Sequence, residues 1–251
     1  MFTDHKTESG GIILGSSDFY TKFSDNYHKY VNSKKDYLNA VDLFIKSEIN
    51  HCDSLVDVGT GDGKRVERLC HELRITNITL IDNSRGMIEL ARKIPNVEVI
   101  FADIANQNFI STKTYNTVLC LWNVIGHIST SEKRVIALRN LAKLAGPEGE
   151  IFLDVNNRYN ISNYGVISVF RNIFKDFFYP TTGNGDFLVD VGLGNNRIRT
   201  MGHIFNPNEI ENLFIKSGLK IIKRKIINYK TGCEGRNVFG GQLVYRLSIF
   251  P

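Results

Sequence analysis

A short run of apolar residues that breaks into three closely spaced glycines constrains the fold of this chain more than any other feature. The run is Leu55–Val58, and the glycine segment Gly59–Gly63 follows it directly. Apolar residues at helical spacing come next, at Val66, Leu69 and Leu73. The pattern predicts a strand, a tight turn and a helix. Because glycine lacks a Cβ atom and tolerates positive φ, such a turn lets a ligand approach backbone N–H groups.

The spacing of these glycines argues against two common nucleotide-binding loops. The dinucleotide pattern is G-x-G-x-x-G, but here the third glycine comes one position early and Lys64 stands where the last glycine belongs. No G-K-[ST] follows the turn, which argues against a phosphate-binding loop of the Walker type. The flanking carboxylates of Asp57 and Asp62 favour a cationic ligand over a pyrophosphate.

At Asp57 and Gly59–Gly63 the chain resembles motif I of the class I S-adenosylmethionine (SAM)-dependent methyltransferases. SAM carries an ammonium and a sulfonium and no phosphate, which agrees with the flanking aspartates. The resemblance extends from about Asp53 to Phe250. It implies SAM as the cofactor, S-adenosylhomocysteine as the product and a methyltransferase activity.

Strand-like and helical segments alternate along the centre of the chain, which predicts a parallel sheet covered on both faces. The expected strands are Ser54–Val58, Ile78–Ile81, Val97–Phe101, Tyr115–Leu121, Glu150–Val155, Leu219–Asn228 and Gln242–Phe250. The resemblance implies an α/β fold with three layers, built on a Rossmann-like seven-stranded sheet that is mainly parallel. It also implies that the last strand is antiparallel.

The length of 251 residues favours one domain with room for added segments. We expect residues 1–50 to form an N-terminal helical lid over the ligand, as in small-molecule methyltransferases. Residues 157–205 interrupt the regular alternation and are expected to form a substrate-side insertion. Within it, Phe187–Val191 and Arg197–Ile204 predict a hairpin.

The composition of the chain limits the partners and the compartment that we expect for it. The polar N-terminus lacks the apolar segment of a secretory signal, and no apolar run approaches the ~20 residues that span a bilayer. We therefore expect a cytoplasmic protein, without a membrane partner, that is a monomer or a homodimer. The net charge of +5 is mild, so nucleic acid is not the expected partner. The four cysteines are scattered without close pairs, so no metal site is expected.

Polar residues at successive strand ends predict the cofactor contacts. Asp82 lies about 20 residues beyond the glycine turn, where an acid accepts the ribose hydroxyl protons. Met87 suits the adenine face. The resemblance implies that Asp103 accepts from the adenine amino group and that the N–H of Ile104 serves a ring nitrogen. The full set expected to bind SAM is Asp57, Gly59, Thr60, Gly61, Asp62, Gly63, Asp82, Asn83, Met87, Ala102, Asp103, Ile104, Leu121, Trp122 and Asn123.

The sequence constrains the residues that would bind the methyl acceptor less than those that would bind SAM. His127 follows the fourth expected strand and has the near-neutral titration of a general base, although a structural histidine is the competing interpretation. Tyr20 and Tyr27 lie in the expected lid, with Tyr20 as a second catalytic candidate and Tyr27 as a substrate contact. Asn156, Asn157, Arg158 and Tyr159 follow the fifth expected strand and offer polar groups to the acceptor; a surface turn is the alternative.

These features together predict methyl transfer from SAM to an oxygen or nitrogen atom of a small polar acceptor, anionic acceptors included. A sugar or capsule precursor and an amino-acid derivative are examples. Two alternatives stay open at this point. One is an RNA methyltransferase, although no N-P-P-Y motif follows the fourth expected strand. The other is a regulatory or scaffold protein that binds SAM without turnover.

Overall fold

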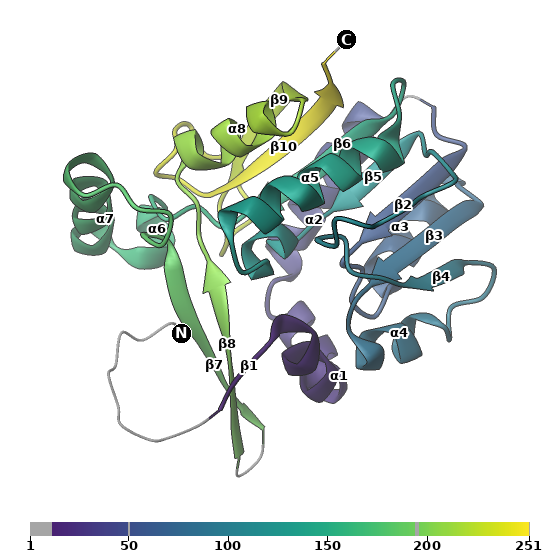
Figure 1. The fold of residues 1–251 in the computed structure, drawn as a ribbon, viewed down its shortest axis with the longest axis horizontal. Coiled ribbons are helices and arrows are strands. Elements are labelled where there is room, and N and C mark those ends of the chain that lie inside the picture. Colours follow the sequence, from purple (N-terminus) through teal and green to yellow (C-terminus); the bar gives the residue numbers. More distant parts are fainter. Residues whose placement is uncertain (1–11, 50, 194–195, 251) are drawn as a thin grey trace.

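A seven-stranded sheet forms the middle layer of the molecule (Figure 1). The computed structural model describes residues 12–49, 51–193 and 196–250. In this part of the chain the strand order is β4-β3-β2-β5-β6-β10-β9, and β10 runs antiparallel to both of its neighbours. The strands are β2 (Ser54–Val58), β3 (Asn77–Asp82), β4 (Glu98–Phe101), β5 (Thr117–Cys120), β6 (Glu150–Val155), β9 (Leu219–Ile227) and β10 (Gln242–Ile249). The predicted fold class and the antiparallel last strand are confirmed.

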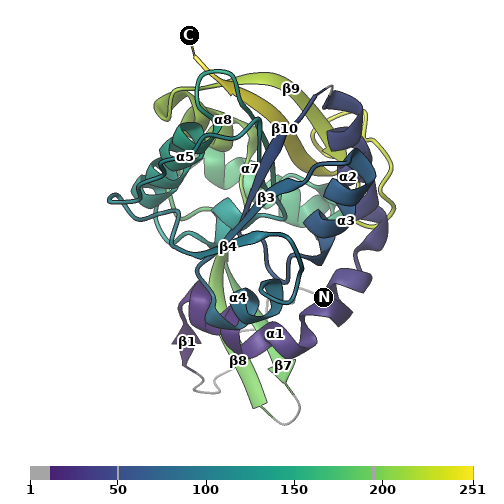
Figure 2. The same ribbon diagram turned by 90° about the vertical axis from the view of Figure 1, so that its right-hand side faces the viewer.

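Helices cover both faces of this sheet. Figure 2 shows α5 (Ser131–Ala145) and α8 (Pro207–Lys216) on one side, and α2 (Lys35–Glu48) and α3 (Lys64–Leu73) on the other. Each side has its own apolar core, because the central strands are buried on both faces. The short helix α4 (Arg85–Ala91) begins at Ser84, whose hydroxyl accepts from the Met87 N–H at 3.4 Å.

A second, three-stranded sheet has the order β1-β8-β7. Its strands are β1 (Ile13–Leu14), β7 (Asp186–Leu193) and β8 (Asn196–His203). The β7–β8 hairpin confirms the prediction from sequence, whereas the parallel pairing of β1 with β8 was not anticipated. The α1 helix (Ser16–Asn32) packs against β8 and α4, and the Thr21 hydroxyl lies 3.0 Å from that of Ser84.

The helical segments not yet described follow β5 and β6. A 3-10 turn, η1 (Val124–His127), follows β5, while α6 (Ile161–Tyr164) and α7 (Val166–Phe178) follow β6. The aromatic composition of residues 160–179 did not reveal these two helices. None of the helices in the described ranges is both long and apolar enough to cross a bilayer.

The carboxylate of Asp154 fixes the end of β5 at the centre of the sheet. It accepts the hydroxyl proton of Tyr37 from α2 at 2.5 Å and the backbone N–H of Trp122. Trp122 and Asn123 both have left-handed backbone conformations, with φ of 63° and 62°. Such values are uncommon outside glycine and need support from the surroundings. Asp154 supplies it, so the chain leaves β5 in a defined direction.

We predict that Tyr37→Phe lowers the free energy of unfolding by about 1–3 kcal/mol, because a buried carboxylate loses a hydrogen bond. Tyr245→Phe is the matched control, since Tyr245 is equally buried but its hydroxyl bonds to the half-exposed Glu211 at 3.1 Å. Urea unfolding of both variants measures the difference. An equal or smaller loss for Tyr37→Phe would remove the anchoring role of Asp154.

Candidate active site

A cavity of about 540 Å³ lies at the carboxyl ends of the central strands. The ends of β2, β3, β4 and β5 form its floor, and α1 and β7 form its walls. This edge of a parallel sheet is where open α/β folds bind their ligands. The cavity therefore joins the N-terminal helix and the inserted hairpin to the glycine turn.

The glycine turn follows β2 as predicted, and its three glycines have φ of 73°, 60° and 73°. A Cβ atom on Gly59 would lie 2.4 Å from the Val124 side chain, and one on Gly61 would lie 2.6 Å from the Tyr27 hydroxyl. Gly63 has a different surrounding, because a Cβ there would meet Ile94 and Leu80 in the core. The first two glycines line the cavity and the third allows α3 to pack closely.

Asp82 ends β3 and lines the cavity beside the glycine turn. One carboxylate oxygen accepts from the Gly61 N–H at 3.0 Å, and the other accepts from the Ser84 N–H at 2.8 Å. Burial raises the pKa of this carboxyl to about 6, although these backbone hydrogen bonds partly oppose the shift. Asp82 thus connects the turn after β2 with the start of α4.

The other residues expected at the adenine and at the centre of the cofactor also line this cavity. They are Asn83, Met87, Ala102, Asp103, Ile104, Leu121, Trp122 and Asn123. They come from three successive strand ends, as the parallel topology requires. The structure therefore brings these residues together at one edge of the sheet.

A second cavity of about 480 Å³ adjoins the first and is lined by further motif residues, whereas Gly63, which was expected to bind SAM, lines neither cavity. Asp57, Thr60 and Asp62 line the second cavity together with the cationic side chains of Lys35 and Arg65. Burial raises the pKa of Asp57 to about 6. Both cavities share four lining residues, namely Tyr27, Gly59, Leu121 and Trp122. Tyr27 lies against Gly61 and stands between the two spaces.

Tyr20 and His127 form a pair, although 107 positions separate them in sequence. The Tyr20 hydroxyl lies 3.0 Å from Nε2 of His127, and both residues line the cavity. Nδ1 of His127 is buried without a partner. Burial lowers the pKa of His127 to about 4, so the imidazole is neutral near pH 7. Burial also raises the pKa of Tyr20 far above its ordinary value, which keeps its hydroxyl protonated.

Two aromatic residues that the sequence did not single out complete the central wall. The ring of Tyr30 stacks on Trp122 with centroids 5.1 Å apart, and Trp122 Nε1 donates to the Tyr229 hydroxyl at 3.0 Å. Both tyrosines line the larger cavity. The helical spacing of Tyr20, Tyr27 and Tyr30 on α1 was the signal that could have identified Tyr30.

The outer part of the cavity is apolar with a few polar groups at its margin. Phe19 and Phe23 of α1 line the cavity together with Phe187 and Val189 of β7, and Val189 packs against the cluster of Phe19 and Phe23. Lys133 and Asn156 also line the cavity. The Asn156 N–H donates to the Asn123 side chain at 2.9 Å, which ties the end of β6 to the end of β5.

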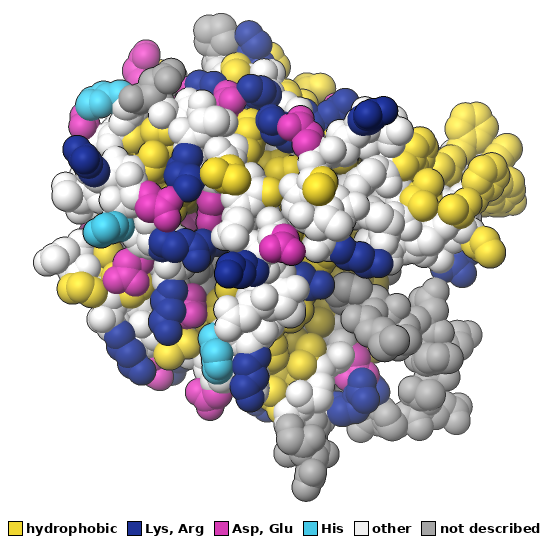
Figure 3. All heavy atoms as spheres, turned by 180° about the vertical axis from the view of Figure 1, so that it is seen from behind, with side chains coloured by type: hydrophobic (Ala, Val, Ile, Leu, Met, Phe, Trp, Pro, Cys, Tyr) yellow, Lys and Arg dark blue, Asp and Glu magenta, His cyan; other side chains and the backbone are white. Residues whose placement is uncertain are grey.

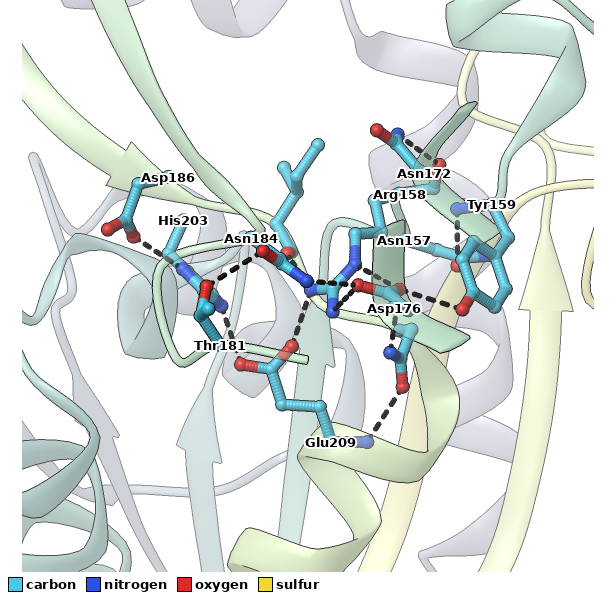
Figure 4. A network of polar contacts seen from close by, with 12 residues as sticks. Asn157, Arg158, Tyr159, Asn172, Asp176, Thr181, Asn184, Asp186, His203 and Glu209 are labelled. Carbon is cyan, nitrogen blue, oxygen red and sulfur yellow. Dashed lines mark hydrogen bonds and ion pairs between the residues drawn. The ribbon is translucent and has the colours of Figure 1, made fainter. Parts of the chain in front are cut away.

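The structure places Asn157, Arg158 and Tyr159 away from the cavity, contrary to expectation (Figure 4). Asn157 is buried, with its amide donating to the carbonyls of Val238 and Gly241. The Arg158 guanidinium binds Asp176 in a bidentate manner, at 2.8 and 2.9 Å, and also contacts Glu209 at 2.5 Å.

Partners from distant parts of the chain therefore neutralise this arginine. The Tyr159 hydroxyl donates to Asp176 at 2.7 Å, so it belongs to the same network. His203 extends it, with its two ring nitrogens 2.6 Å from Asp186 and 2.7 Å from Glu209. The network attaches α7 and the β7–β8 hairpin to the start of α8. None of its side chains lines the cavity.

Within the described ranges, no group of three or more His, Cys, Asp or Glu side chains is arranged to hold a metal ion.

Comparison with known proteins agrees with this geometry. Residues 55–149 match the model of a methyltransferase domain family. No curated protein matches the sequence. Many solved structures match the fold, among them the CcbJ methyltransferase from Streptomyces caelestis, at 14% identity and a TM-score of 0.66 over 93% of this chain and 98% of that one.

Two further structures are also similar to this one over nearly the whole chain. A SAM-dependent methyltransferase from Clostridium acetobutylicum has 15% identity and a TM-score of 0.63, covering 92% of this chain and 99% of that one. A possible histamine N-methyltransferase from Thermotoga maritima has 16% identity and a TM-score of 0.61, covering 92% and 98%. Residues 55–149 thus match a methyltransferase domain family, and nearly the whole chain shares its fold with solved SAM-dependent methyltransferases.

Proposed function

We propose that the protein transfers the methyl group of SAM to a nitrogen or oxygen atom of a small acceptor. The observation that carries this proposal is the Tyr20–His127 pair in the wall of the cavity that begins at Gly59 and Gly61. The glycine turn exposes backbone groups and suits the methyl donor. The Tyr20–His127 pair lines the same cavity and suits the acceptor.

The residues of the cavity fit the chemistry of SAM. Asp82 suits the ribose hydroxyls, and Met87 and Asp103 suit the two sides of the adenine. The second cavity offers Asp57 to an ammonium and the Lys35 cation to a carboxylate, which are the groups at the methionine end. Arg65 also lines this cavity, but its guanidinium is paired with Asp42 at 2.8 Å. When bound, SAM supplies a methyl group that its sulfonium already activates for displacement.

The chain must then align the acceptor and exclude water. The α1 helix suits both tasks, because its Tyr27 lies against Gly61 and its Tyr20 lies beside His127 in the cavity wall. This is the lid role proposed for the N-terminal segment. In-line attack requires the nucleophile on the far side of the methyl group from the sulfur atom, and the space between α1, η1 and β7 provides that room.

The protonation state of His127 favours a nitrogen acceptor. A neutral imidazole accepts a proton, but a pKa of about 4 makes it a weak base at pH 7. Deprotonating an alcohol requires a stronger base, whereas a neutral amine attacks through its lone pair and loses its proton after the transfer. His127 and Tyr20 therefore suit the orientation of an amine by hydrogen bonds. The likeness to a possible histamine N-methyltransferase from Thermotoga maritima supports the same choice.

The outer wall of the cavity refines the proposed acceptor. Phe19, Phe23, Phe187 and Val189 favour an acceptor with an aromatic or aliphatic body. Lys133 and Asn156 offer polar contacts at its margin and suit an anionic or carbonyl group on the acceptor. The expectation of a polar acceptor thus becomes a proposal of an amphipathic one. Arg158 and Tyr159 take no part in it, because their polar groups bind Asp176.

The two other hypotheses have less support. A scaffold without turnover would be expected to fill the acceptor space with apolar side chains, whereas a cavity of about 540 Å³ is open beside Tyr20 and His127. An RNA substrate would be expected to require a basic groove beside the site. The described residues at the outer wall are mostly apolar, with Lys133 as a basic member.

We predict that SAM affinity falls as the pH is lowered through 6. Binding favours the ionised Asp82 and Asp57, and the pKa of each is about 6 in the protein alone. One pH unit below this value each carboxyl is about nine-tenths protonated, which corresponds to a loss of about tenfold in affinity for each group that must ionise. Titration calorimetry between about pH 8 and pH 5 measures this loss.

Asp82→Asn is the control for this prediction. We expect it to bind SAM more weakly at pH 8 and to lose part of the pH dependence, because one of the two titrating groups is gone. Asn83 lines the same cavity and is not ionisable, so Asn83→Ala should keep the pH dependence of the wild type. An affinity that does not change with pH would show that neither carboxylate contacts the cofactor.

We predict that His127→Ala and Tyr20→Phe reduce methyl transfer about 10- to 100-fold while SAM affinity changes less than about threefold. Transfer of a tritiated methyl group from SAM to a mixture of small amines and phenols provides the readout. Tyr245→Phe, far from the cavity, is the matched control. Because the pKa of His127 is lowered to about 4, the wild-type rate at saturating SAM should show no inflection near the ordinary pKa of histidine. Unchanged rates in both variants would move the acceptor site elsewhere.

A further inference from the structure

The α7 helix is oriented with its polar side inward and its apolar side outward. Asn172 donates to the Arg158 carbonyl at 3.2 Å, and Asp176 binds the Arg158 guanidinium. Its one buried side chain is Val169. The opposite face carries large apolar side chains that are between 52% and 87% exposed: Val166, Ile167, Phe170, Phe174, Phe177, Phe178 and Tyr179. We call these seven residues the α7 patch.

The patch is a single raised surface. Figure 3 shows it as the large group of hydrophobic side chains that projects at the right-hand edge, where α7 lies in that view. The rings also contact one another, with centroids 4.5 Å apart for Phe174 and Phe178 and 4.9 Å apart for Phe177 and Phe178. Ordinary surface helices have the reverse polarity. An apolar face of this extent marks an interaction site on a folded protein.

The helix that carries the patch is firmly held. Asp176 accepts hydrogen bonds from Arg158, Tyr159, Asn184 and Asn206. The hydrogen bonds of Arg158, Asn206 and Tyr159 lower the pKa of Asp176 in spite of its burial, so the carboxylate stays ionised at neutral pH. The outer face is therefore presented by a preorganised helix, which reduces the entropic cost of binding a partner.

The size of the patch matches one half of a protein interface. Large apolar side chains offer on the order of 150–250 Å² each, and more than half of each is exposed here, which amounts to roughly 800 Å². A standard interface buries about 800 Å² on each partner. None of the seven patch residues is charged, so a second copy of the same surface can pack on them through apolar contacts.

The charge of α7 also favours a second copy of the chain over a lipid surface as the partner of the patch. Anionic membranes are recognised by clusters of about four to eight Lys and Arg residues. The α7 helix carries Arg171 and Lys175 as its basic residues, which falls short of such a cluster. We infer that the α7 patch is a homodimer interface, in which α7 of one chain packs against α7 of a second copy about a two-fold axis.

The mass in solution tests this inference. Light scattering coupled to size exclusion should give twice the chain mass of 28.5 kDa for the full-length protein. The double variant Phe170→Glu/Phe177→Glu should be monomeric, with a dissociation constant raised at least about 100-fold by buried charge. Ile110→Glu is the matched control, because Ile110 is 84% exposed but lies outside the patch, and it should remain dimeric. Retained SAM binding by calorimetry verifies that each variant is folded.

Three outcomes would overturn the inference. The first is a monomeric wild type at about 100 μM, well above the Kd expected of a standard interface. The second is a double variant that dimerises like the wild type. The third is a monomeric wild type that sediments with phosphatidylglycerol vesicles but not with phosphatidylcholine vesicles, which would assign the patch to a lipid surface.

Discussion

The cavity depends on the buried carboxylate of Asp154. It joins α2, through Tyr37, to the backbone that leaves β5, through the N–H of Trp122. Burial raises the pKa of this carboxyl, so its ionised form needs the hydrogen bonds that it receives. In return, the left-handed residues Trp122 and Asn123 are held so that η1 turns toward the cavity and presents His127. One buried carboxylate thus sets the direction of the segment that carries His127.

Local pattern and parallel topology were sufficient to predict that the residues expected to bind SAM converge at one edge of the sheet. Asp82 and Asp103 follow successive strands, and parallel strands end at the same edge of a sheet. Their convergence follows from the strand order without any knowledge of side-chain packing. The antiparallel last strand, in contrast, came from the resemblance, since no residue in Gln242–Ile249 specifies its direction.

The acceptor side could be predicted only in part, because its contacts join segments far apart in sequence. Tyr20 and His127 were each identified as candidates, but no local signal pairs an N-terminal helix with the turn after β5. Arg158 was misjudged for the same reason. An arginine beside polar residues suggests a ligand contact, whereas its neutralising partners Asp176 and Glu209 come from α7 and α8. Sequence shows a charge but does not show which distant charge compensates it.

The two walls of the cavity come from separable parts of the chain. The glycine turn and the strand ends lie within residues 55–149, whereas α1, β7 and β8 lie outside that range. Substitutions in α1 or the hairpin can therefore alter the space opposite the donor without disturbing the sheet. A fold built this way can change the shape of the space opposite the glycine turn while the turn and the strand ends stay the same.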